Sequence, residues 1–429
     1  MANFALIVGK IVAFILGLFN RGSALPGKIA LRLEPDILSH FKFPNKIIAI
    51  TGTNGKTSTT RYVSDIFEKA GYQVVSNFKG ANLHQGIVTE LVNNSSINLK
   101  VKADVLVLEI DEMTLVNLYD VLKPTELVMT NLFPDQADRF GSVEELAAKM
   151  NDSLTSETKL ILNANDPSLV WIGDSHPTFD KVYYGLAEQD FDQPTHTVNC
   201  SNCGEPLTYS HQFYEHIGYF NCINCGLKTP EIDVLGHNVS IEGQNFNVSN
   251  TPITVPQANL YSVFNTLAAV TVAQETNIDL STINEALKMV KTIKGRNDNL
   301  SVDGKDIYVN MAKNPAGMNQ SISTVLSQVE GPYSLVLSAN NKKADGVSIE
   351  WFNACSFDRL NNENLKNIYV SGMVASELAD VLVSQGIPKD KIQTAEPKAA
   401  IDLLVNDNTA RQHFILANYT ALDDLYATL

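Results

Sequence analysis

Short apolar runs alternate with longer amphipathic stretches along the first 165 residues of the chain. Apolar runs of this length are typical of buried parallel strands, and stretches with helical spacing, such as 57–71 and 143–154, predict helices. The predicted strands are 47–50, 73–76, 104–110, 126–131 and 159–163. Their alternation with helices predicts a doubly wound, mostly parallel α/β sheet.

The pattern changes near residue 190, where a stretch rich in Cys, Asn, His, Tyr and Gly predicts a small inserted module. Two helices, 259–275 and 281–291, are expected after it, and a second α/β pattern begins near residue 300. Its predicted strands are 334–338, 367–371 and 413–417. We therefore expect an N-terminal helical segment over 1–40, a central domain over 41–299 with an insertion at about 196–230, and a separate α/β C-terminal domain over 300–429.

Residues 4–19 are mostly apolar but are interrupted by Lys10. The run is shorter than the roughly 20 residues that a membrane span needs, and residues 1–3 supply no charge of the kind that begins a signal peptide. We expect a helix that packs on the body of the protein, and peripheral contact of that helix with a membrane surface is the alternative.

The composition is that of a globular protein, with 44% hydrophobic and 18% charged residues. The net charge of −15 disfavours nucleic acid as a partner. Four of the five cysteines form two Cys-x-x-Cys pairs, which is not the pattern of a secreted disulfide framework. A reducing, cytoplasmic location is therefore expected.

A glycine-rich turn, Thr51-Gly52-Thr53-Asn54-Gly55-Lys56-Thr57, joins the first predicted strand to the first predicted helix. This architecture binds phosphate at the helix N-terminus. The glycines let the backbone approach an anion, Lys56 adds positive charge, and the hydroxyl of Thr57 suits Mg²⁺. Ile50 stands where the strict motif has its first glycine, so a purely structural turn is the alternative. The predicted ATP contacts are Gly52, Thr53, Asn54, Gly55, Lys56 and Thr57.

Glu109-Ile110-Asp111-Glu112 ends the third predicted strand, at the edge of an open α/β sheet where ligands and metals collect. Carboxylate oxygens suit Mg²⁺, and Glu109 is the predicted magnesium ligand together with Thr57. The alternative is a solvated acidic strand end. Further along, Asp166 is either part of a functional turn or a helix cap.

The two cysteine pairs have the spacing of a zinc ribbon, since 18 residues separate them. Cys200, Cys203, Cys222 and Cys225 are the predicted ligands. Four thiolates fill a tetrahedral site and leave no open position, so the expected Zn²⁺ is structural.

These motifs together resemble the Mur ligases and, among them, the MurT-type subunits of lipid II isoglutaminyl synthase. The segments that carry the resemblance are 25–27, 51–57, 80–83, 109–112, 135–141, 312–317, 344–346, 418–420 and the ribbon. Because the loop begins at residue 51, we expect the chain to lack the N-terminal domain with which other Mur ligases bind a UDP-sugar. The resemblance implies that Lys56 and Glu109 serve catalysis, that Asn265 lies on the adenine side, and that Arg296 holds a phosphate. A surface ion pair is the alternative for Arg296.

The same resemblance implies a partner and a reaction. A glutamine amidotransferase subunit of the GatD type releases ammonia, and the MurT-type subunit uses ATP to activate the α-carboxylate of D-glutamate in lipid II. The product is D-isoglutamine. A stand-alone muramyl- or folyl-type ligase and a non-catalytic scaffold are the alternative functions.

The chain departs from the family pattern at several positions. Gln136 and Phe140 replace histidines, and Ser262 replaces an asparagine that precedes Asn265. In the C-terminal domain, the family's Ala-Asp-Gly-x-Asp motif reads 344–348 with Ser348 in place of the second Asp, which is expected to complete the partner's Cys-His-Asp triad. Asp345, or Glu350 beyond the motif, is the expected substitute.

Overall fold

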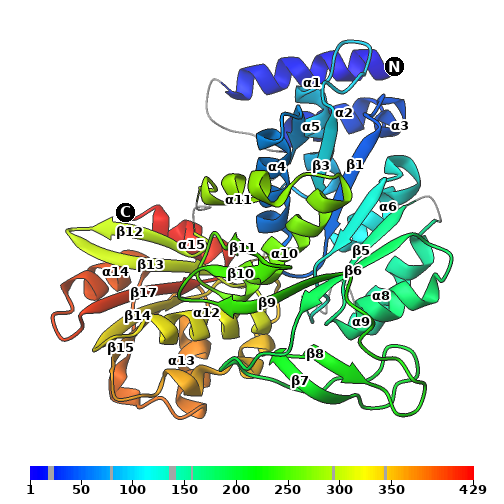
Figure 1. Ribbon diagram of the computed structural model, residues 1–429. Helices are drawn as coiled ribbons and strands as arrows, with labels where there is room; N and C mark the ends of the chain where they lie inside the picture. Colours follow the sequence, from blue (N-terminus) through cyan, green and yellow to red (C-terminus); the bar gives the residue numbers. More distant parts are fainter. Residues whose placement is uncertain (18–23, 78–80, 135–141, 156–157, 292–294, 343–344) are drawn as a thin grey trace. The chain divides into compact units, whose positions relative to one another are not determined.

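The computed structural model describes residues 1–17, 24–77, 81–134, 142–155, 158–291, 295–342 and 345–429 (Figure 1). The chain forms two compact units. The first comprises Met1–Leu132, Val143–Asp190 and Thr197–Val290, and the second comprises Phe133–Ser142, Phe191–His196 and Lys291–Leu429. The domain bounds expected from the sequence stay a prediction.

A nine-stranded sheet in the order β11-β10-β9-β6-β5-β4-β1-β3-β2 forms the centre of the first unit. The strands from β2 to β9 in this order pair in parallel, and β10 and β11 pair antiparallel at one edge. Their bounds are β1 Lys46–Thr51, β2 Val74–Ser76, β3 Val105–Glu109, β4 Glu126–Met129, β5 Lys159–Asn163, β6 Lys181–Leu186, β9 Val234–Ser240, β10 Asn245–Val248 and β11 Thr251–Thr254. The predicted fold class, a mostly parallel doubly wound sheet, is confirmed.

Three helices precede β1, helices α4 to α9 alternate with the strands β1 to β6 as the pattern predicts, and α10 and α11 follow β11. Their bounds are α1 Ala2–Gly17, α2 Leu25–Leu33, α3 Ile37–His40, α4 Lys56–Lys69, α5 His84–Asn93, α6 Glu112–Leu122, α8 Val143–Ser153, α9 Pro167–Ser175, α10 Leu260–Glu275 and α11 Leu280–Lys288. Among the described residues, none of the helices is both long enough and apolar enough to cross a bilayer.

The expected N-terminal helix packs on the body of the first unit. Helix α1 contacts α2 and α5, and it buries Ala5, Leu6 and Gly9 (dark blue in Figure 1). Helices α2 and α5 approach closely at Gly27, where an added Cβ would lie 2.0 Å from the carbonyl oxygen of Gln85. A side chain at this position would therefore force the two helices apart.

Strand register brings the polar ends of three strands to one edge of the sheet. Ile50 of β1 pairs with Glu109 of β3, and Thr51 pairs with Met129 of β4. The phosphate loop, the acidic segment and the residues after β4 therefore meet at the carboxyl ends of parallel strands, where open α/β sheets bind ligands.

The predicted insertion folds as a hairpin of β7 (Thr208–Tyr214) and β8 (Ile217–Asn221), which Figure 1 shows. One cysteine pair precedes β7 in the sequence, and the other follows β8. Leu207, Phe220 and Leu227 of the insertion belong to the same core cluster as residues of α9 and β5. The ribbon is therefore anchored to the first unit by packing.

The second unit contains a six-stranded sheet in the order β12-β13-β17-β14-β15-β16, parallel except for β12. Apolar clusters cover both of its faces. Its elements are β12 Asp298–Val302, β13 Lys305–Met311, α12 Pro315–Gln328, β14 Tyr333–Ser338, η1 Glu350–Ala354, η2 Phe357–Leu360, β15 Leu365–Ser371, α13 Ala375–Ser384, η3 Lys389–Lys391, β16 Ile392–Thr394, α14 Pro397–Asn406, β17 Gln412–Ala417 and α15 Tyr419–Tyr426. The predicted separate α/β C-terminal domain is confirmed as a fold.

Candidate active site and metal centre

The phosphate loop connects β1 to α4 and takes a backbone path that needs glycine. Gly52 has a φ of 124° and Gly55 a φ of 90°, both in the region that disfavours residues with a Cβ. Gly55 is also the N-cap of α4 and has no side chain with which to cap the helix. No side chain at the N-cap therefore competes with an anion for the first amide groups of α4, and the helix dipole favours negative charge there.

Close packing fixes the loop on two sides. A Cβ added at Gly52 would lie 2.3 Å from Oγ1 of Thr130, and one added at Gly55 would lie 2.1 Å from Oδ1 of Asn265. Asn265, predicted on the adenine side, therefore lies directly against the phosphate loop. The two glycines are required for space as well as for backbone conformation.

The residues after β4 brace the middle of the loop. Asn131 accepts the amide of Asn54 at 2.9 Å through Oδ1 and the amide of Thr53 at 2.8 Å through its carbonyl oxygen. Thr130 donates its hydroxyl to the carbonyl oxygen of Asn54 at 2.7 Å. These bonds fix the conformation of the loop before a ligand binds. Less conformational entropy is therefore lost on binding.

Lys56 is buried at the start of α4. Its Nζ donates to the carbonyl oxygens of Gly52 at 2.5 Å and Thr53 at 3.3 Å, and to Oε1 of Glu112 at 3.1 Å. Glu112 is buried as well, at the start of α6. The ammonium group is therefore held beside the loop by one carboxylate and two carbonyl groups. Like the carboxylate, the oxygens of a phosphate are negatively charged acceptors for this group.

Glu109 ends β3 with 2% of its surface exposed. Oε1 accepts a hydrogen bond from Nδ2 of Asn82 at 2.9 Å, and the Glu109 amide donates to Asn77 at 2.7 Å. Oε2 is buried and has no hydrogen-bond partner among the described residues. An unpaired buried carboxylate oxygen fits a hard cation, and Thr57 lies in the first turn of α4, which contacts β3. The Glu109 carboxylate thus fits a Mg²⁺ ligand, and the joint role of Glu109 and Thr57 in holding the ion stays a prediction.

Ser262 takes the place of the family's asparagine inside the first unit. It is 1% exposed on α10, and its hydroxyl lies 3.2 Å from the hydroxyl of Tyr62 on α4. The serine therefore joins two packed helices, which a longer side chain would disturb.

The expectation that Asp166 caps a helix is confirmed, and its part in a functional turn stays a prediction. Its Oδ1 accepts the amide of Ser168 at 2.9 Å at the start of α9, and its Oδ2 accepts the amide of Leu132 at 2.8 Å. Gln136 and Phe140, two further departures from the family pattern, lie outside the described residues.

The four ribbon cysteines converge on one point. Their sulfur atoms all lie within 4.8 Å of one another, with Cys200 and Cys222 buried. Gly204 and Gly226 follow the two knuckles with φ values of 80° and 82°, and their amides donate back to the carbonyl oxygens of Cys200 and Cys222. This compact set of thiols fits a tetrahedral metal ion such as Zn²⁺.

Two thiols of the cluster are predisposed to lose their protons. A hydrogen bond from Asn202 lowers the pKa of Cys225 to about 6, and one from Asn224 lowers the pKa of Cys203. Burial raises the pKa of Cys200 to about 12. Each knuckle thus supplies an asparagine to a thiol of the other knuckle, and thiolates are the form that binds metal.

Arg296, Asp345 and Ser348 belong to the second unit. Arg296 is partly buried just before β12. Asp345 is 1% exposed, and its carboxylate accepts the amide of Thr420 at 2.8 Å and the Thr420 hydroxyl at 2.5 Å. Asp345 therefore holds the start of α15 within its own unit.

Ser348 is exposed, and its hydroxyl accepts the amide of Glu350 at 3.3 Å at the start of η1. Glu350 is exposed too. Of the two carboxylates considered as substitutes for the missing aspartate, Glu350 is thus the accessible one. The triad role of these residues and the phosphate role of Arg296 stay predictions.

Sequence reasoning overlooked the residues that hold the predicted ones in place. In the sequence, Glu112 stands out only as part of an acidic segment, and no local pattern predicts its contact with Lys56. Asn77 and Asn82, which hold Glu109, and Thr130, which braces the loop, were not singled out either. The one local signal was that each lies at or after the end of a predicted strand.

Comparison with known proteins gives a family match for each of the two units. Residues 50–273 match the model of the Mur ligase middle domain, and residues 311–422 match that of the MurT ligase C-terminal domain. The chain is 30% identical to the MurT subunit of lipid II isoglutaminyl synthase from Streptococcus pneumoniae, over 98% of this chain and 95% of the relative. It is 32% identical to the Staphylococcus aureus subunit of the same name, over 84% of this chain and 82% of the relative.

Solved structures agree on the fold. A pseudomurein peptide ligase type C from Methanothermus fervidus is similar with a TM-score of 0.72 at 20% identity, over 92% of this chain and 80% of that one. MurF ligase from Thermotoga maritima, solved in complex with ADP, is similar with a TM-score of 0.62 at 15% identity, over 93% of this chain and 83% of that one. The phosphate loop, the ribbon and the near full-length match to two MurT subunits lead to one conclusion: the chain belongs to the MurT branch of the Mur ligases, a family of ATP-dependent ligases.

Proposed function

We propose that this chain is the synthetase subunit of a lipid II isoglutaminyl synthase, which converts the α-carboxylate of D-glutamate in the lipid II stem peptide to the amide. The observation that carries the proposal is the 30% identity to a named MurT subunit over 98% of the chain. The braced phosphate loop with Lys56 supports it, because the reaction needs ATP bound at such a loop.

The reaction has two steps. A carboxylate oxygen of D-glutamate attacks the γ-phosphorus of ATP, which gives an acyl phosphate and ADP. The nitrogen of ammonia then attacks the acyl carbon, phosphate leaves with the bonding electrons, and the nitrogen loses one proton. Amide formation is thereby driven by ATP hydrolysis.

The residues of this chain have distinct roles in that scheme. Lys56 transfers its hydrogen bonds from Glu112 and the loop carbonyl groups to the terminal phosphates, while the first amides of α4 hold the phosphate chain. Glu109 and Thr57 would hold Mg²⁺, which neutralises charge on the transferring phosphoryl group when bound. Asn265 positions the nucleotide beside Gly55.

We assign the release of ammonia from glutamine to a separate GatD-type glutamine amidotransferase subunit. The chain has five cysteines, of which four converge in the ribbon. The fifth, Cys355, is 4% exposed and its thiol points to the carbonyl oxygen of Trp351 at 3.6 Å. A buried thiol in this setting does not suit a glutaminase nucleophile.

Mass spectrometry of lipid II tests the proposal. Lipid II is incubated with the chain, ATP and Mg²⁺, with ammonium in one reaction and with glutamine plus a GatD-type subunit in another. Amidation with ammonium, seen as replacement of a hydroxyl by an amino group at D-glutamate, is the expected result. Absence of amidation in both reactions, with ATP binding intact, would move the assignment to a non-catalytic scaffold or to a different substrate.

A further inference from the structure

Helix α1 exposes a continuous apolar face. The side chains of Phe4, Ile7, Ile11, Phe14 and Ile15 recur at helical spacing, and Phe14 is 72% and Phe4 57% exposed. They lie opposite the residues that pack on α2 and α5. Large apolar side chains gathered on one face of a helix, without cover from the described residues, mark an interaction surface.

The charges around this face are unlike those of the rest of the chain. Helix α1 contains no acidic residue, and Lys10 is its single charged side chain. Residues 1–104, which precede β3, contain 12 Lys and Arg against 6 Asp and Glu, a net charge of +6. The remaining residues contain 20 against 41, a net charge of −21. The segment 1–104 is thus basic, although the protein as a whole is acidic.

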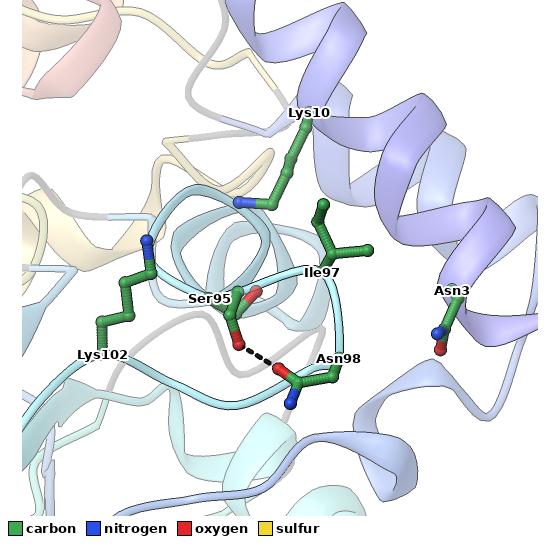
Figure 2. Close-up of a pocket in the computed structure, with 7 residues that line it drawn as sticks. Asn3, Lys10, Ser95, Ile97, Asn98 and Lys102 are labelled. Atoms are coloured by element: carbon green, nitrogen blue, oxygen red, sulfur yellow. Dashed lines mark hydrogen bonds between the residues drawn. The ribbon is translucent and has the colours of Figure 1, made fainter.

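Two lysines meet beside α1 at a pocket formed by the helix and the loop 94–102. Figure 2 shows Lys10 of α1 and Lys102 of the loop reaching toward the same region, together with Ile97, which is 66% exposed. Burial lowers the pKa of Lys10, and the positive charge of Lys102 lowers it further. Ser95, Ser96 and Asn98 line the same pocket. Paired ammonium groups with hydroxyl and amide neighbours suit phosphate oxygens.

We propose that the exposed face of α1 and the Lys10–Lys102 pocket dock on the surface of an anionic phospholipid bilayer. The helix lies in the plane of the interface, with Phe4, Ile11 and Phe14 in the boundary between headgroups and acyl chains. Lys10 lies at the margin between the buried and exposed faces, from which a lysine reaches the headgroup level. An anionic surface is the occupant because basic charge flanks the apolar face, whereas the rest of this protein repels such a surface. The proposal does not rest on the proposed reaction.

The test is co-sedimentation of the full chain with vesicles of phosphatidylcholine alone and with vesicles of equal parts phosphatidylcholine and phosphatidylglycerol. The wild type is expected to bind the mixed vesicles and to bind phosphatidylcholine far more weakly. Changing Phe4, Ile11 and Phe14 together to Ser lowers the partition coefficient at least roughly a hundredfold. The pair Lys10→Gln and Lys102→Gln lowers it by roughly thirtyfold and weakens its dependence on salt.

Controls keep the result interpretable. Met289→Ser removes a methionine that is 70% exposed at the end of α11, and it should leave vesicle binding unchanged. Circular dichroism melts of every variant should match the wild type, since the changed side chains lie outside the core. Equal binding to both kinds of vesicle, or wild-type binding by the triple Ser variant, would overturn the proposal. Sedimentation of the lipid-free chain as a dimer that the triple variant dissociates would also overturn it, in favour of a second copy as the occupant.

Discussion

The ammonium group of Lys56 lies 3.1 Å from a carboxylate oxygen of Glu112, and both side chains are buried. A second Lys–Glu pair, Lys46 with Glu126, lies at the start of β1, and the other end of this strand leads into the phosphate loop. The two pairs are chemically alike, but only the first lies beside the phosphate loop. They therefore separate the structural contribution of a largely buried ion pair from its contribution to nucleotide binding.

Changing Lys56 to Met should weaken binding of MgATP roughly ten- to a hundredfold, because a charged hydrogen-bond donor to the phosphates is lost. The variant should also lose stability, by about 3–5 kcal/mol, since Glu112 is left buried without its partner. Isothermal titration with a non-hydrolysable ATP analogue and urea unfolding measure the two effects. Lys46→Met is the matched control: it should lower stability while the nucleotide affinity stays that of the wild type.

Glu109→Gln should raise the Mg²⁺ concentration needed for activity and lower the rate at saturating ATP by about a hundredfold or more. The amide has the same shape but cannot supply the negative oxygen that the buried Oε2 position offers. Steady-state rates over a Mg²⁺ titration measure both effects. Glu126→Gln replaces another buried glutamate of the same sheet and should leave the Mg²⁺ dependence unaltered. An unchanged titration curve in Glu109→Gln would exclude the carboxylate as a metal ligand.

One equivalent of zinc per chain is expected by elemental analysis of the purified protein. Cys222→Ser should abolish zinc binding and lower the melting temperature, because the ribbon shares the core of the first unit. Cys355→Ser, which changes a buried cysteine of the second unit, should keep the full zinc content. Retention of zinc by the Cys222 variant would mean that the metal lies elsewhere.

Asp407 should make the stability of the second unit depend on pH. Burial by itself would raise the pKa of this carboxyl, but hydrogen bonds from Ser334, Thr409 and Asn367 outweigh it and hold the pKa well below its usual value. A carboxyl whose pKa is lowered by folding contributes stability above its unfolded pKa of about 3.9, and this contribution is lost as the pH falls toward the folded value.

Asp407→Asn should therefore cost about 2–4 kcal/mol at neutral pH and less in acid. Urea unfolding at pH 7 and at about pH 2, which lies between the unfolded and the folded pKa, measures the difference. Asp402→Asn, at an exposed position on α14, should change stability by less than about 0.5 kcal/mol at either pH. A pH-independent loss in the Asp407 variant would show that its charge is not the cause.

Ser348→Asp should raise glutamine-dependent amidation and leave ammonium-dependent amidation unchanged, since a carboxylate stabilises the imidazolium of a partner triad better than a hydroxyl does. Asn353→Asp introduces the same charge at an exposed position of η1 and should change neither rate. If both variants gain equally, the effect is one of surface charge and the triad role of position 348 is wrong.

Several elements could be predicted because their signals are local. The strand 159–163 has the bounds that its apolar run gives, and α4 starts within one residue of its predicted position, since a glycine turn followed by an amphipathic pattern defines a helix start. The ribbon cysteines converge as their spacing requires. The single strand that pairs antiparallel at one edge of the second sheet, β12, carries no such apolar run and was not foreseen.

By itself, the sequence determined the phosphate loop, the ribbon and the alternation of strands and helices, because each depends on residues close together in the chain. Only the tertiary structure decided which side chains meet across long separations. The pairing of Lys56 with Glu112, the hold of Asn77 and Asn82 on Glu109, and the attachment of Asp345 to Thr420 are of this kind. They depend on the order of strands in each sheet, which is set by how whole apolar faces pack rather than by any local pattern.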